Sequence, residues 1–305
     1  MSKSTVYIVD VPVATLWTSY DSARDIDQPG LENPCAVSEW LKQLDYDNKL
    51  ELCTKNLVQS QVLYGQEVYV QEVKEGWAHV LVPEQASSKN KEGYPGWIAV
   101  NQLKQNNRFL LENNPIAVVR VPLTALYNKQ LDVEMEISYQ TTLPVMEQKE
   151  EWTIVQTPSD QKWIKNKDIH VFQSKYHLGK GNGISIIEEG KKFLHLEYLW
   201  GGMSAYGYDC SGFSYTMCKA NGYTIPRDAH EQAEGGEAIP LNKLEPGDLL
   251  FFANEEGKGN IHHVGIYYGN NKLLHSPKTG KTIEIQSMAG TLYEKELCIA
   301  RRYWE

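Results

Sequence analysis

Residues 261–269 read IHHVGIYYG, a run that follows the two-residue period of a β-strand. Successive side chains of a strand point to opposite faces, so His263 and Gly265 share one face and His262 lies on the other. Further strands are expected at 249–252, 272–275 and 297–301, and helices from about residue 184 and over 210–220. Helices followed by an antiparallel sheet predict an α+β domain over residues 183–305.

The two histidines at positions 263 and 275 are predicted to meet across this sheet. If Gly269 centres a tight reversal, His263 lies directly opposite His275, and opposed Cβ atoms are about 4.5–5.5 Å apart. His275 would then hold one ring nitrogen of His263. The other nitrogen would be left to face a nucleophile.

Cys210 is the nucleophile that this arrangement favours. It stands at the predicted first turn of the helix over 210–220, where unpaired N–H groups and the helix dipole favour a thiolate and lower the pKa of the thiol. A buried structural cysteine is the alternative interpretation. The facing histidines favour a nucleophile, a base and an orienting residue at Cys210, His263 and His275.

The N-terminal part contains an internal repeat. Residues 11–17 are echoed by 121–127, residues 75–80 by 150–155, and residues 96–98 by 162–164. Each copy consists of short alternating runs, which predicts two small all-β barrels in tandem. In order and spacing they resemble bacterial SH3-like (SH3b) domains. The expected domains are residues 1–112, 113–173 and 183–305, with a linker at 173–182.

The first of the two repeats carries two insertions. One contains Val37, Trp40, Leu41 and Leu44 at helical spacing and predicts an amphipathic helix. The other is a turn-rich loop at 89–95, which includes Tyr94. Long loops on a small rigid barrel are often functional.

Composition limits the functions and surroundings that fit this chain. A net charge of -9 over 305 residues opposes binding to nucleic acid or to an anionic polymer, and favours a diffusing substrate. Five cysteines without paired spacing argue against a disulfide framework. No apolar run of about 18 residues and no secretory signal is apparent, so we expect a cytoplasmic protein, secreted only if a signal has been removed.

Three segments carry a resemblance to a known family: DCSGF at 209–213, PGDLLFF at 246–252 and HVGIYYG at 263–269. They resemble the signature blocks of the NlpC/P60 cell-wall cysteine peptidases. The resemblance implies a papain-like α+β catalytic domain without a metal or other cofactor. It also implies Cys210 as nucleophile, His263 as base and His275 as orienting residue, with Tyr198 near the oxyanion site and Trp200 lining the substrate groove.

Two SH3b-like domains before the catalytic domain are similar to the arrangement in γ-D-glutamyl-L-diamino acid endopeptidases of murein peptide recycling. That resemblance implies a small peptide substrate with a free N-terminal L-Ala, and no nucleic acid, membrane or obligate protein partner. It implies an amine pocket with Asp209, Ser211 and groups of the first barrel, where Tyr94 is the candidate and the acidic partner is unassigned. Asp209 also fits a helix N-cap. Many relatives have Ser or Thr near the position of Ala229.

Three other functions compete with this interpretation. Cys210, His262, His263 and His275 are possible zinc ligands, but strand alternation sends His262 away from the other two histidines. A wall-binding protein with an inactive catalytic domain is the second alternative, against which the intact catalytic positions count. A cell-wall amidase is the third, and it differs only in the bond that is cut.

Overall fold

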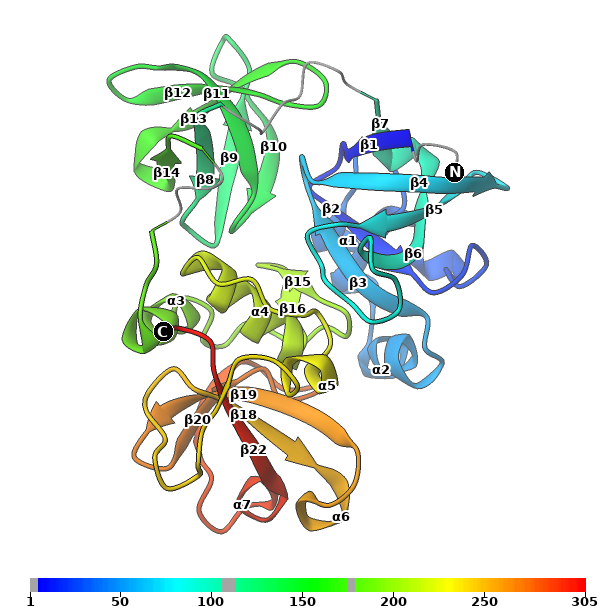
Figure 1. Ribbon diagram of the computed structural model, residues 1–305. Helices are drawn as coiled ribbons and strands as arrows, with labels where there is room; N and C mark the ends of the chain where they lie inside the picture. Colours follow the sequence, from blue (N-terminus) through cyan, green and yellow to red (C-terminus); the bar gives the residue numbers. More distant parts are fainter. Residues whose placement is uncertain (1–4, 106–113, 175–178) are drawn as a thin grey trace. The chain divides into compact units, whose positions relative to one another are not determined.

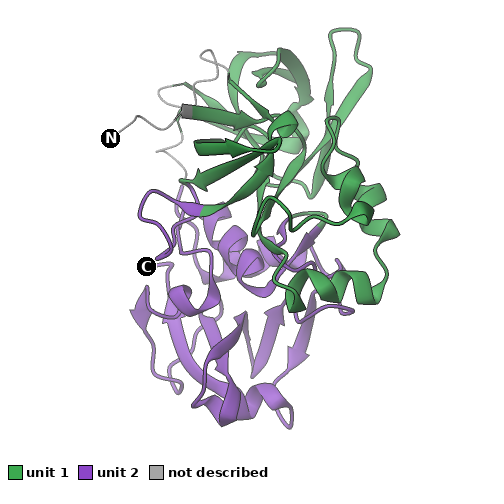
Figure 2. Ribbon diagram, turned by 90° about the vertical axis from the view of Figure 1, so that its right-hand side faces the viewer, with its two compact units in different colours: residues 1–83, 95–178, 204–206 green, residues 84–94, 179–203, 207–305 purple. Residues whose placement is uncertain are grey.

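A computed structural model describes residues 5–105, 114–174 and 179–305 of the chain. The described residues form two compact units (Figure 2). Unit 1 contains residues 1–83, 95–178 and 204–206, and unit 2 contains residues 84–94, 179–203 and 207–305. Among the described residues, no helix is both long and apolar enough to cross a membrane. The expected linker at 173–182 and the boundary at 112 fall partly on residues outside the described ranges, so these boundaries stay predictions.

Unit 1 contains two seven-stranded antiparallel sheets with the same connectivity (Figure 1). The first sheet has the order β3-β2-β6-β5-β4-β1-β7 and the second β10-β9-β13-β12-β11-β8-β14. The strands of the first are β1 (Thr5–Val9), β2 (Val13–Trp17), β3 (Val58–Leu63), β4 (Glu67–Lys74), β5 (Trp77–Val82), β6 (Tyr94–Ala99) and β7 (Leu103–Lys104). Those of the second are β8 (Ile116–Val119), β9 (Leu123–Tyr127), β10 (Val133–Ser138), β11 (Thr142–Gln148), β12 (Trp152–Gln156), β13 (Gln161–Lys165) and β14 (Ile169–Phe172).

The sequence repeat corresponds to equivalent positions in these two sheets. Trp17 pairs with Trp97 between β2 and β6, and Tyr127 pairs with Trp163 between β9 and β13. The repeat therefore predicted both barrels correctly. Ile8 and Tyr64 of the first barrel join the core cluster of the second, whereas Val13, Val37 and Leu63 form a separate cluster in the first.

The expected helical insertion of the first barrel is present between β2 and β3. It forms α1 (Val37–Gln43), which buries Val37 and Trp40 as the spacing predicts. Two elements that the sequence analysis did not predict accompany it, the 3-10 helix η1 (Asp25–Gly30) and α2 (Tyr46–Thr54). The buried Asp27 carboxylate is paired with Arg24 at 2.9 Å and also accepts from the indole N–H of Trp40 at 2.9 Å. Short 3-10 turns η2 (Val100–Gln102) and η3 (Asn166–Asp168) precede the last strand of each sheet.

Unit 2 is an α+β domain around a six-stranded antiparallel sheet of order β17-β22-β18-β19-β20-β21 (Figure 1). Its strands are β17 (Glu237–Ala238), β18 (Leu249–Ala253), β19 (Ile261–Gly269), β20 (Lys272–His275), β21 (Glu284–Ser287) and β22 (Leu297–Arg302). Its helices are α3 (Gly183–Lys191), α4 (Cys210–Ala220), α5 (Ala229–Gln232), α6 (Asn254–Gly257) and α7 (Leu292–Glu296). A short ladder joins β15 (Met203–Ser204) and β16 (Gly207–Tyr208).

The hairpin between β19 and β20 differs from the prediction. Its reversal is centred on Asn270 and Asn271, both with positive φ, because asparagine tolerates the left-handed region that a two-residue hairpin turn requires. Ile266 consequently lies opposite Leu274. His263 is therefore not directly opposite His275, and the predicted register was wrong by two residues. Gly265 takes the place near His275 instead, since a Cβ built on Gly265 would lie 2.9 Å from the Cβ of His275.

Candidate active site

Helix α4 begins at Cys210 because the preceding residue caps it. The Asp209 side chain accepts a hydrogen bond from the backbone N–H of Gly212 at 2.6 Å, which is the N-cap contact expected for aspartate. Cys210 is buried, with 8% of its surface exposed. Helix α4 packs against β19, and the backbone N–H of Val264 hydrogen-bonds the Cys210 sulfur. The nucleophile candidate thus lies beside the strand that carries His263.

Burial controls the charge state of this thiol. It raises the pKa of Cys210 to about 12; the neighbouring Asp209 carboxylate acts in the same direction, and the Val264 N–H and the Arg227 guanidinium act in the opposite one. The expectation of a lowered pKa was therefore wrong. The helix start is present, and the loss of hydration is the largest cause of the pKa shift. Cys210 is a neutral thiol in this structure at neutral pH.

His263 and His275 meet although they are not directly opposed. His263 Nε2 and His275 Nδ1 are 2.8 Å apart, and the two side chains are almost fully buried. The neighbouring aromatic rings of Phe252 and Tyr293 have centroids 5.7 and 5.4 Å from that of His263. With Nε2 occupied, the second ring nitrogen of His263, Nδ1, remains available for the thiol. Cys210, His263 and His275 are called the reaction centre below.

Both histidines of the reaction centre are held neutral. Burial lowers the pKa of His263 well below its usual value, and the charges of His275 and His262 lower it further. Burial likewise lowers the pKa of His275 to about 4, although the Gln286 side chain acts in the opposite direction. One neutral ring must donate and the other accept in the bond between them. A His263 that donates from Nε2 has a bare Nδ1, which is the tautomer that a general base requires.

His262 lies on the opposite face of the strand, as alternation predicts. Its Nε2 is 3.0 Å from Glu296 Oε2 in helix α7. Among the residues that the structure describes, the one cluster whose ligand atoms converge closely enough for a metal ion is Asp228, His230 and Glu231. The zinc site considered from the sequence, with Cys210 and three histidines, does not form such a cluster in the described part of the chain.

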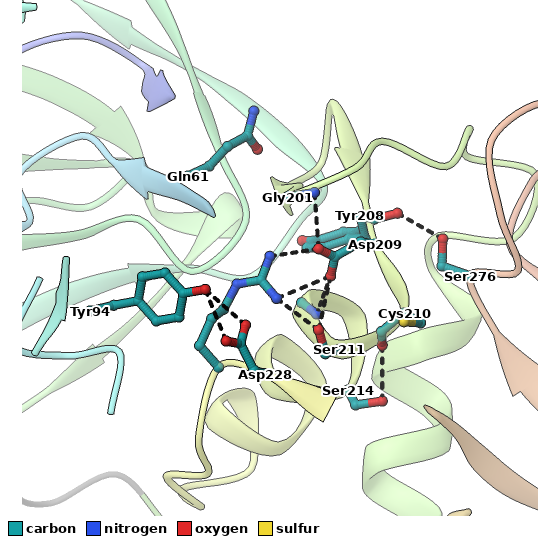
Figure 3. A network of polar contacts seen from close by, with 12 residues as sticks. Gln61, Tyr94, Gly201, Tyr208, Asp209, Cys210, Ser211, Ser214, Asp228 and Ser276 are labelled. Atoms are coloured by element: carbon teal, nitrogen blue, oxygen red, sulfur yellow. Dashed lines mark hydrogen bonds and ion pairs between the residues drawn. The ribbon is translucent and has the colours of Figure 1, made fainter. Parts of the chain in front are cut away.

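Asp209 has a buried ionic partner that the sequence analysis did not identify (Figure 3). Arg227 is 1% exposed and donates from Nη2 to Asp209 Oδ2 at 2.7 Å and from Nη1 to Oδ1 at 3.2 Å. Its Nη1 also donates to the Ser211 hydroxyl at 2.8 Å. The backbone N–H of Gly201 also donates to Asp209 Oδ2, at 3.0 Å. A buried carboxylate needs a cation, and that requirement was the available sequence signal for Arg227.

Asp228, the residue after Arg227, carries a second ionic contact. The Tyr94 hydroxyl lies 3.0 Å from both carboxylate oxygens of Asp228 (Figure 3). Lys89 Nζ lies 3.0 Å from Asp228 Oδ2. Lys89 Nζ also hydrogen-bonds the Tyr94 hydroxyl and lies 4.2 Å from the centroid of its ring. We call Asp209, Arg227, Asp228, Tyr94 and Lys89 the ionic cluster. The acidic residue in contact with Tyr94 is thus Asp228 of the catalytic domain, whereas the sequence analysis expected an acidic partner from the first barrel.

Tyr94 and Lys89 belong to the second insertion of the first barrel. Residues 84–94, which contain both, are part of unit 2. Residues 84–94 contact helices α4 and α5 through several hydrogen bonds. Tyr215 donates to the Glu84 carbonyl at 2.6 Å, the Arg227 N–H to the Ala86 carbonyl at 3.1 Å, and the Ser88 N–H to Glu231 Oε1 at 2.6 Å. The loop is therefore part of the domain that carries the reaction centre.

The segment containing Tyr198 and Trp200 runs beside the start of α4. Tyr198 is buried and forms a backbone bridge with Tyr208, and the Asp209 N–H donates to the Gly202 carbonyl at 3.3 Å. Trp200 is half-buried. The predicted oxyanion role of Tyr198 and the groove role of Trp200 stay predictions.

This geometry is that of enzymes that use a cysteine thiol as nucleophile and a histidine, oriented by a further polar residue, as base. The NlpC/P60 family model matches residues 195–302, and the YKFC SH3b2 domain model matches residues 119–172. The chain belongs to the NlpC/P60 family of cysteine peptidases.

Two relatives are similar over nearly their whole length. The γ-D-glutamyl-L-lysine dipeptidyl-peptidase of Bacillus subtilis is 45% identical over 95% of this chain and 96% of its own. The enzyme of the same name from Bacillus cereus is 39% identical over 99% of this chain and 92% of its own. The crystal structure of an NlpC/P60 family protein from Bacillus cereus superposes with a TM-score of 0.95, at 38% identity and covering 99% of this chain and all of that one. This likeness extends to both barrels as well as the catalytic domain.

Proposed function

We propose that this protein hydrolyses the bond between γ-D-Glu and an L-diamino acid in wall-derived peptides that have a free N-terminal L-Ala. The names of the two Bacillus relatives support this substrate. The single observation that carries the proposal is the Asp228 carboxylate beside Tyr94, because an ammonium group already binds there. A site that selects an N-terminal amine needs such a carboxylate.

The reaction centre supplies the chemistry of this proposal. His263 Nδ1 removes the proton from Cys210 as the sulfur attacks the γ-carbonyl carbon of D-Glu. The resulting imidazolium is stabilised by the bond from Nε2–H to His275 and then donates its proton to the departing amine of the diamino acid. Water, activated by His263, hydrolyses the thioester and releases L-Ala-γ-D-Glu. Cys210 is thus the nucleophile, His263 the general base and acid, and His275 the orienting residue.

Within the ionic cluster, Asp228 and Tyr94 supply recognition of the amine. The Asp228 carboxylate forms an ion pair with the ammonium of L-Ala, and the Tyr94 hydroxyl donates a hydrogen bond to the same carboxylate. Asp209 and Ser211 form the neighbouring part of the pocket, and Arg227 joins both of them to the segment that carries Asp228. Because Asp209 directly precedes Cys210, the pocket holds the substrate a fixed distance from the nucleophile. The bond that is cut is therefore the one that follows the second residue from the free amine.

The role of the enzyme follows from this substrate. Peptides with a free L-Ala are released fragments, since L-Ala of intact wall is joined to muramic acid. We therefore propose that the protein recycles murein peptides in the cytoplasm, which agrees with its net charge of -9. Lysine and diaminopimelate both fit as the diamino acid.

The free amine is the feature to test. We expect kcat/KM for L-Ala-γ-D-Glu-L-Lys to exceed that of the N-acetylated peptide at least about a hundredfold, equivalent to about 2.7 kcal/mol. Blocking the amine removes the ion pair with Asp228 and leaves that carboxylate without its substrate partner. Product masses identify the bond that is cut and distinguish an amidase. Equal values for the two peptides would contradict end recognition.

A further inference from the structure

Lys89 places a primary ammonium group on the carboxylate assigned to the substrate amine. Its Nζ is 3.0 Å from Asp228 Oδ2 and hydrogen-bonds the hydroxyl of Tyr94. The same Nζ lies 4.2 Å from the centroid of the Tyr94 ring, within the range of a cation–π contact. Carboxylate, hydroxyl and aromatic face together are the groups that an N-terminal ammonium would use.

The backbone next to Lys89 is fixed, whereas its side-chain end is accessible. Ser88 donates from its N–H to Glu231 Oε1 at 2.6 Å, and its hydroxyl also bonds this oxygen. The Lys89 N–H donates to the Ser87 hydroxyl at 3.1 Å. The Lys89 side chain is nevertheless 39% exposed, against 18% for that of Asp228. A long side chain with a fixed origin and a hydrated end can leave its partner without any change in the loop.

We propose that Lys89 is an internal competitor of the substrate amine: its ammonium occupies the Asp228–Tyr94 position in the free enzyme and is displaced when L-Ala binds. This inference rests on the proposed function, because it takes Asp228 as the amine partner. Two ammonium groups repel each other, so Lys89 and the substrate cannot both occupy the carboxylate. One cation replaces another, and Asp228 is never left without a charge partner.

The exchange has a kinetic consequence. Only molecules in which Lys89 has left Asp228 can bind the amine, so the apparent dissociation constant is the intrinsic one divided by the open fraction. If Lys89 is bound in about four-fifths of the molecules, KM is raised about fivefold. The chemical step uses the displaced state and is unaffected. Lys89 thereby favours ligands that carry a cation able to displace the Lys89 ammonium from Asp228.

Lys89→Met tests this proposal. We expect KM for L-Ala-γ-D-Glu-L-Lys to fall about fivefold with kcat unchanged, and the N-acetylated peptide to show no such gain. In a Cys210→Ala background, calorimetry should show the product L-Ala-γ-D-Glu binding about fivefold more tightly when Lys89→Met is added. Lys89→Arg, which keeps a cation, should keep the higher KM.

Lys91→Met is the matched control, because Lys91 is exposed in the same loop and its removal changes the net charge equally. It should leave KM unchanged, which separates displacement from a general charge effect. An unchanged KM in Lys89→Met would overturn the proposal, and a raised KM would show that Lys89 binds the substrate instead. A wild-type enzyme that does not distinguish free from acetylated peptide would contradict the amine pocket itself, and this outcome is separate from either result with Lys89.

Discussion

The reaction centre and the ionic cluster adjoin each other in the sequence at Cys210 and Asp209 but differ in electrostatics. In the reaction centre, burial raises the pKa of Cys210 and lowers those of both histidines, so that all three groups are neutral. In the ionic cluster, Arg227 and Lys89 each face a carboxylate within 3.0 Å. The difference agrees with the proposed function, in which charge holds the substrate and appears in the reaction centre only during catalysis.

Cys210→Ala should have the largest effect, because it removes turnover without changing the ionic cluster. Removing the nucleophile should reduce turnover by at least about four orders of magnitude, since nucleophile and base act as a unit. The ionic cluster is untouched, so the product dipeptide should still bind with its wild-type affinity in calorimetry. Loss of binding together with turnover would show that the two regions cannot be separated. Activity lost to a chelator and restored by zinc would favour the metal alternative instead.

Arg227→Met attacks the ionic cluster and should have the next largest effect. It leaves the buried Asp209 carboxylate without a cation, which costs about 3–5 kcal/mol in the free energy of unfolding, measured in urea. Lys219→Met is the control: its pair with Glu84 is more exposed, and its loss should cost about 1 kcal/mol or less. Adding Asp209→Asn to Arg227→Met should recover part of the stability. No recovery would show that the uncompensated carboxylate is not the cause.

The smallest effect is on the pH profile, whose two limbs should report the two regions separately. His263 must be neutral to act as a base, and its lowered pKa keeps it neutral well below pH 6.5, so kcat/KM should fall only in more acidic solution. Above about pH 8 a free L-Ala amine loses its proton, and with it the attraction to Asp228. The acetylated peptide should lack this basic limb.

An acid limb at or above pH 6.5 would contradict a neutral reaction centre. It would instead indicate that burial does not lower the pKa of His263. The assays are run at constant ionic strength, so that the screening of the charges in the ionic cluster is the same at every pH.

Local patterns predicted the parts of the site that are determined locally. Asp209 caps α4, and Asn221 and Gly222 end it, because caps depend on adjacent residues. Strand alternation placed His263 and His262 on opposite faces of β19. The hairpin register was missed because Asn270 and Asn271, rather than Gly269, form the turn.

The parts that depend on distant residues were missed. Arg227 meets Asp209 across 18 positions of sequence, and Asp228 meets Tyr94 across 134. No local pattern encodes either pair. The pKa of Cys210 was mispredicted for the same reason, since burial is a property of the folded domain and is the largest cause of the shift. The barrels were predicted better, because a repeat supplies the same pattern twice.

The loop at 84–94 also has a consequence for how the protein is made. Its partner Tyr215 lies 131 residues further along the chain, which a ribosome adds in roughly ten seconds. During synthesis, the strands on either side of the loop are complete long before helix α4 exists. The catalytic domain therefore finishes folding around a segment that an earlier domain has held ready, and a fragment starting at residue 183 would emerge without it. We expect such a fragment to depend on the N-terminal part, added in trans, for its stability.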